Sequence, residues 1–169
     1  MVARRLGVAM KAVPEFRTLP MAAYKSSSDT SKRSDEIAAW LLRAAGTGAS
    51  AEEVVASIVV IWQDIDGALT PIIGPRGVAA LFHRSLHLAA QSQPLLAAIQ
   101  TGTLTTMDLS ALKLQLAAQT PAAAAAAAGV LLHTFHELLG TLIGASLTER
   151  LLRSVWPPLL TSTPQDSKS

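Results

Sequence analysis

All four histidines of the chain lie in two close pairs, and these pairs are its clearest candidates for chemistry. His83 and His87 are four residues apart, and His133 and His136 are three residues apart. On a helix, each spacing places both imidazoles on one side. Two imidazoles so arranged can share a metal ion, and Glu137 could add a carboxylate oxygen. The two pairs therefore suggest a site for a metal ion, a haem or another small ligand, although the sequence identifies no particular cofactor.

The competing interpretation is that both pairs are ordinary residues of a polar helix face. His83 and His87 lie opposite the apolar stripe of their predicted helix, where they would meet water or a partner. His133 and Glu137 are spaced to form an i, i+4 pair on the polar side of theirs. Neither pair belongs to a His-Glu-x-x-His motif, and no Glu-x-x-His pair recurs on two helices. We therefore favour solvated histidines over metal ligands.

A different chemistry is suggested by residues 135–142, in which His136 is followed by Glu137 and Leu138. This run resembles the phosphoacceptor box of sensor histidine kinases, and the resemblance implies that His136 accepts a phosphoryl group. The basic residue and the Thr-Pro step of that box are absent, so the resemblance implies at most a stand-alone phosphotransfer module. The sequence shows no glycine-rich phosphate loop and no nucleophile elbow. We predict that the protein is not an enzyme.

Helices must position these side chains, because apolar residues recur with a helical period and no segment alternates as a strand does. Capping residues, glycines and prolines set the expected boundaries. The predicted helices cover residues 34–46, 50–67, 74–89, 94–100, 105–118, 120–139 and 146–156. We predict an all-α bundle of six or seven helices over residues 34–158. It lies between a flexible basic arm and linker, residues 1–33, and a flexible tail, residues 159–169.

The predicted arm differs in charge from the predicted bundle. Residues 1–33 carry a formal charge of +5, and the remaining residues carry −3. An acidic folded part argues against nucleic-acid binding, which needs a basic face. The absence of cysteine fits a reducing compartment, so we expect a cytoplasmic protein.

The most unusual segment is residues 114–148, which carry one formal charge and include seven consecutive alanines, residues 122–128. It is long enough to span a bilayer, which needs about 20 apolar residues. However, His133, Thr134 and Glu137 would form a polar stripe opposite its leucines. We therefore expect this segment to be a buried helix of a soluble bundle rather than a membrane span.

A weak internal similarity links residues 73–85 with residues 143–154. Both segments begin with an Ile-Gly step, at Ile73 and Ile143, and both then enter a predicted helix. The similarity makes an internal duplication a hypothesis.

Apolar residues left on polar helix faces suggest a function. Val59 and Val60 fall on or beside the polar side of their helix, and Val130 does so on the alanine-rich helix. Exposed apolar side chains of this kind often mark partner surfaces. We therefore expect a bacterial-type regulatory or adaptor module that forms a homodimer or docks a protein partner. The competing expectation is a small-ligand sensor or carrier with the histidines near the rim of its pocket.

Overall fold

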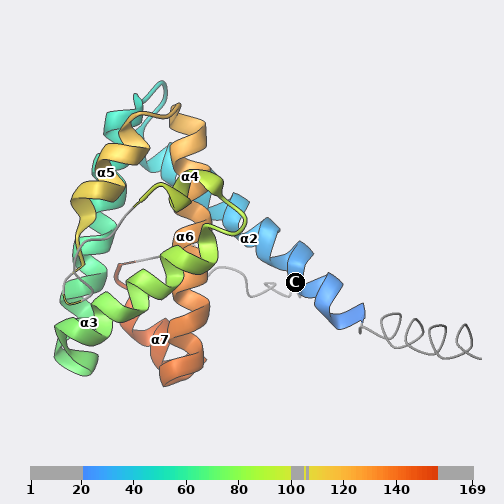
Figure 1. Ribbon diagram of the computed structural model, residues 1–169, viewed down its shortest axis with the longest axis vertical. Helices are drawn as coiled ribbons and strands as arrows, with labels where there is room; N and C mark the ends of the chain where they lie inside the picture. Colours follow the sequence, from blue (N-terminus) through green and yellow to red (C-terminus); the bar gives the residue numbers. More distant parts are fainter. Residues whose placement is uncertain (1–20, 100–104, 106, 156–169) are drawn as a thin grey trace, which may run out of the picture. The chain divides into compact units, whose positions relative to one another are not determined.

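The computed structural model describes residues 21–99, 105 and 107–155. This part of the chain contains six α-helices and no strand, which confirms the all-α fold (Figure 1). The helices are α2 (Met21–Ala45), α3 (Ala51–Ala89), α4 (Pro94–Ala97), α5 (Leu109–Ala117), α6 (Pro121–Ile143) and α7 (Ala145–Leu152). The chain divides into two units between Lys32 and Arg33, and the bundle belongs to the second unit. Residues 1–20 of the predicted arm and the predicted tail, residues 159–169, lie outside the described residues.

Helix α2 corrects the later part of the predicted flexible arm and linker, residues 1–33, because the chain is helical from Met21 onward. No glycine or proline occurs between Met21 and Ala45, so serines and charged side chains alone do not interrupt the helix. Its later part joins the core through Ile37 and Leu41, both fully buried. The helix ends where predicted, next to Gly46, which has a positive φ.

Helix α3 corrects a second boundary. A break was expected near Gly67, but the helix continues through Pro71 to Gly74, whose φ of 77° and ψ of 162° are not helical. A single glycine costs a helix only about 1 kcal/mol. The buried stripe continues past Gly67 to Leu69, so packing outweighs that cost. Gly74 then turns the chain into the second part of α3, residues 75–89.

Two of the other predicted helix starts are also wrong in detail. Helix α5 is capped by Asp108, whose carboxylate accepts a hydrogen bond from the Ser110 amide at 2.8 Å, and not by Thr105. Helix α7 follows Gly144 directly, without the expected cap at Ser146. Helix α4 ends at Ala97, earlier than predicted. Helix α6 runs four residues beyond the predicted end at Leu139, to Ile143.

The hypothesis of a duplication has a structural counterpart. Residues 51–73 of α3 and helix α6 are equally long, start after side-chain caps at Ser50 and Thr120, and end at Gly74 and Gly144. Gly144, with φ 90° and ψ 148°, nearly repeats the conformation of Gly74. Buried positions repeat at a constant offset of seventy residues: Val54, Ile58, Ile61, Trp62, Ile65 and Leu69 on α3, and Ala124, Ala128, Leu131, Leu132, Phe135 and Leu139 on α6.

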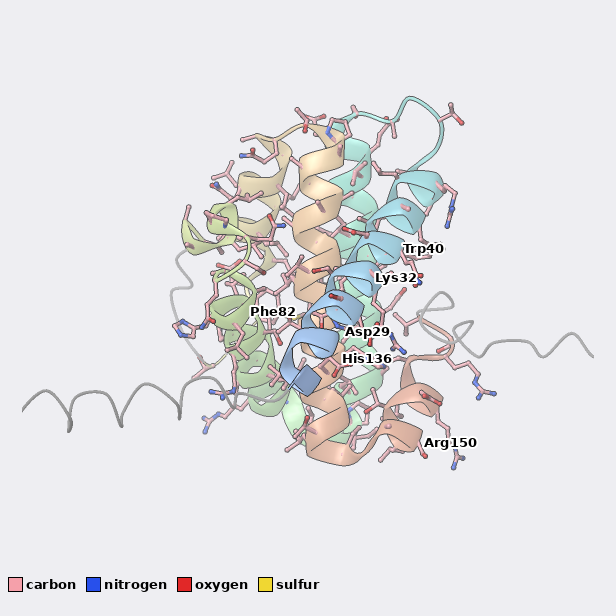
Figure 2. The ribbon with its side chains drawn as sticks, turned by 90° about the vertical axis from the view of Figure 1, so that its right-hand side faces the viewer. Asp29, Lys32, Trp40, Phe82, His136 and Arg150 are labelled. Carbon is pink, nitrogen blue, oxygen red and sulfur yellow. The ribbon has the colours of Figure 1, made fainter. Side chains whose placement is uncertain are left out.

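The core is centred on α3 and α6, which run side by side in both views (Figures 1 and 2). Although aromatic residues make up only 4% of the chain, three of them meet here. The Trp62 ring packs edge-on against Phe82, with 4.9 Å between ring centroids, and against Phe135, with 5.0 Å. The alanines of α6 and Gly129 let the neighbouring helices approach closely around this cluster.

Candidate functional site

The first histidine pair lines a pocket between the second part of α3 and α4. The pocket has a volume of about 380 Å³ and is lined by His83, Leu86, His87, Ala90, Gln91, Leu96, Ala97 and Ile99. His87 is exposed, as predicted, whereas His83 is partly buried. Both ring nitrogens of His83 are shielded and have no hydrogen-bond partner within the described part of the chain. Sequence reasoning offered a pocket with histidines near its rim but did not place it here, because α4, which forms the other wall, carries no chemical motif.

The second pair lies in a different environment from the one predicted. His133 is only 2% exposed, so its expected place on a solvated face is wrong. The reason is that α6 is covered on a second side. At Gly129, one turn before His133, an added Cβ would lie 2.5 Å from the Ser34 carbonyl oxygen of α2. The side of α6 that carries Gly129 therefore faces a neighbouring helix and His133 is buried, whereas Glu137, further along the predicted polar stripe, stays exposed.

Burial lowers the pKa of both histidines of this pair. For His133, burial is the main cause, the Glu137 carboxylate opposes it, and His136 and Arg33 lower the pKa further. For His136, burial also dominates, Glu137 and Glu149 oppose it, and Arg33 adds to it. Both imidazoles are consequently mainly neutral at pH 7. Among the described residues, the Glu137 carboxylate lies within ion-pair distance of His136, 3.9 Å from Oε1 to Nδ1, rather than of His133 as expected.

This arrangement bears on the proposed chemistry of His136. Its side chain is 15% exposed. A phosphoacceptor histidine must meet a phosphoryl donor in line with a ring nitrogen, and a ring so enclosed gives a donor little access.

Over the described ranges, no group of three or more His, Cys, Asp or Glu side chains is placed to hold a metal ion. The two histidine pairs therefore do not combine into one metal site, and Glu137 lies near the second pair only.

The valines proposed to contact a partner differ in exposure. Val60 is 53% exposed, whereas Val59 and Val130 are half-buried and pack against the core. Three other large aliphatic side chains are also exposed and lie beside the Gly74 and Gly144 turns. We call Ile72, Leu142 and Leu147 the elbow patch; they are 46%, 62% and 40% exposed. Both turns lie at the same end of the bundle in both views (Figures 1 and 2).

The elbow patch has charged neighbours of both signs. Arg76 follows the Gly74 turn, and Glu149 and Arg150 lie on α7; all three are exposed. Figure 2 shows Arg150 at this end of the bundle. Sequence reasoning missed the patch because Ile72 and Leu142 were each placed near a predicted helix break. The signal that could have found them is the repeated Ile-Gly step that each one precedes.

Helices α3 and α6 are both long and apolar enough to cross a membrane by length and composition alone. Core helices of soluble proteins can be equally long and apolar. In α6, more than half of the most apolar 18-residue stretch is buried inside the protein.

No protein-family model matches the chain, and neither the curated proteins nor the solved structures compared with it give a match.

Proposed function

We propose that the protein is a non-enzymatic helical regulatory or adaptor module that associates with a second copy of itself through the elbow patch. The observation that supports this proposal is that three exposed large aliphatic side chains, Ile72, Leu142 and Leu147, each lie within three residues of the Gly74 or Gly144 turn. Scattered single exposed side chains are normal on protein surfaces, whereas clustered ones mark contact sites.

Burial of these side chains would supply the driving force for association. Fully burying a leucine or isoleucine contributes about 1.5–3 kcal/mol, and these three begin about half exposed. In a two-fold symmetric dimer, both copies bury the same three side chains, so the free energy gained from each is doubled. A stable interface needs about 800 Å² from each partner, so the turns and part of α7 must join the contact.

The charges around the patch favour a copy of the same chain as the partner. The three patch side chains are uncharged, so they can face their own copies without repulsion. Glu149 and Arg150 place opposite charges on adjacent positions of α7. In a two-fold arrangement, the Glu149 carboxylate of one copy can approach the Arg150 guanidinium of the other. Such a pair orients the contact more than it strengthens it.

Sedimentation of the purified chain over a range of concentrations tests the proposal. We expect the wild-type chain to form dimers, and Leu142→Ser to weaken the dimer at least about tenfold, because two side chains are lost per interface. Leu114→Ser is the matched control, because Leu114 is 76% exposed on α5, outside the elbow patch. This variant should dimerise like the wild type.

Two results would count against the proposal. A wild-type chain that stays monomeric up to about 0.2 mM would exclude a dimer of biological strength. Equal weakening by the Leu142 and Leu114 substitutions would show that the elbow patch is not the contact.

A further inference from the structure

His83, His87 and Gln91 follow one another at intervals of four residues, and all three line the 380 Å³ pocket between α3 and α4. Positions four apart lie on one face of a helix. Gln91 lies in the turn directly after α3 and also lines the pocket. The other lining residues are aliphatic. The pocket therefore presents two imidazoles and one carboxamide on an otherwise apolar wall.

His83 is the unusual member of this row. A neutral imidazole has one N–H donor and one acceptor nitrogen, and His83 uses neither within the described residues, although both nitrogens are shielded from water. Leaving such groups unpaired costs free energy, and a missing ion or ligand is one of the established reasons for finding them. Rotation about the last side-chain torsion is soft for histidine, so the ring can turn a nitrogen toward the pocket.

We propose that His83 and His87 bind a late first-row divalent metal ion, with the Gln91 carboxamide oxygen and water completing the coordination. Imidazole nitrogen is a preferred ligand of Zn²⁺, Ni²⁺ and Cu²⁺. No carboxylate lines the pocket, so Mg²⁺ and Ca²⁺, which require oxygen ligands, are disfavoured. His87 is exposed and gives the ion a route from solvent to His83. The site uses no residue of the elbow patch and does not depend on self-association.

Titration calorimetry with the untagged, chelator-treated full chain tests this site. We expect Zn²⁺ and Ni²⁺ each to bind once per chain with micromolar affinity, and Mg²⁺ to give no binding. Because the two imidazoles share one ion, His87→Gln should weaken binding by at least about tenfold. His83→Gln should have the same effect. His136→Gln is the control and should bind as the wild type does, because His136 belongs to the other pair.

The outcome is decided by His87, whose exposed side chain can be replaced without disturbing the core. Circular dichroism of each variant checks that it is folded. Absence of Zn²⁺ and Ni²⁺ binding at about 1 mM would overturn the proposal. So would unchanged binding in the folded His87→Gln variant, or an equal loss in His136→Gln. Dimerisation measured by sedimentation should be the same in His83→Gln and His87→Gln as in the wild type.

Discussion

At the scale of single residues, the buried His133 makes the stability of the folded protein depend on pH. Its side chain is buried on α6, one turn after Gly129, where α2 approaches closely, and burial lowers its pKa. The same cause lowers the pKa of His136 one turn further on. In the unfolded chain both groups return to ordinary values near 6.5. The unfolded state therefore binds more protons than the folded state just below that pH.

We predict that the free energy of unfolding falls as the pH is lowered below about 6.5. The sign follows from the lowered pKa values: the stabilisation is complete above 6.5 and is lost as the pH falls toward the folded-state values. Each histidine can add at most about 1.4 kcal/mol per pH unit. Urea unfolding between about pH 8 and 5.5, above the range of most carboxylates, measures this slope.

The matched variant is His133→Gln, which keeps a polar side chain but removes the titration. Its stability should change less with pH than that of the wild type over the same range. A wild-type slope that is flat, or that has the opposite sign, would contradict the buried position of His133.

The surroundings of these histidines could not be predicted from the sequence, for a physical reason. A helical projection identifies one apolar face, and His133 falls outside the leucine face of α6. Whether a second face is covered depends on a neighbouring helix that approaches Gly129 at Ser34, which lies 95 residues earlier in the chain. The surroundings of His83 could not be predicted for the same reason, because α4 forms the other wall of its pocket.

At the scale of elements, local signals predicted the helix starts that depend on neighbouring residues. The capping box at Ser50 is present: the Glu53 carboxylate accepts from the Ser50 amide at 2.7 Å, and the Glu53 amide donates to the Ser50 hydroxyl at 3.3 Å. Thr120 caps α6 as predicted, accepting from the Ala123 amide. Helix ends were less predictable than helix starts. Helix α3 continues through Gly67 and Pro71 because its row of buried apolar residues extends to Leu69.

Close contact between α2 and α6 depends on Gly129. We predict that Gly129→Ala destabilises the protein by about 1–3 kcal/mol, because the new methyl group would meet backbone atoms of Ser34 and Ala38. Chemical denaturation measures the effect.

Gly140→Ala on the same helix is the control for this substitution. Gly140 is helical, and its added Cβ would contact nothing within 4 Å. The control should stabilise the protein by about 0.5–1 kcal/mol, through a smaller loss of backbone entropy on folding. If Gly129→Ala were as stable as Gly140→Ala, the close approach of the two helices would be wrong.

At the scale of the whole molecule, two copies of one arrangement account for much of the bundle. In each, a capped helix of equal length ends at a glycine with positive φ and is followed by a further helix. The two stretches share little in sequence beyond the Ile-Gly steps and a few nearby residues. The corresponding buried positions hold different residues, such as Trp62 and Leu132, so sequence similarity alone indicated little of this arrangement. The elbow patch arises because both copies end at the same side of the bundle.

The chain contains no cysteine, so a single introduced thiol reports directly on self-contact at the elbow patch. The most direct measurement is cross-linking of the Leu142→Cys chain with a short bismaleimide, compared with Leu114→Cys on α5. If the elbow patch joins two copies, Leu142→Cys should be converted rapidly to a covalent dimer, and Leu114→Cys should remain monomeric on a denaturing gel. Equal cross-linking of the two variants, or none at position 142 when sedimentation shows dimers, would contradict association through this patch.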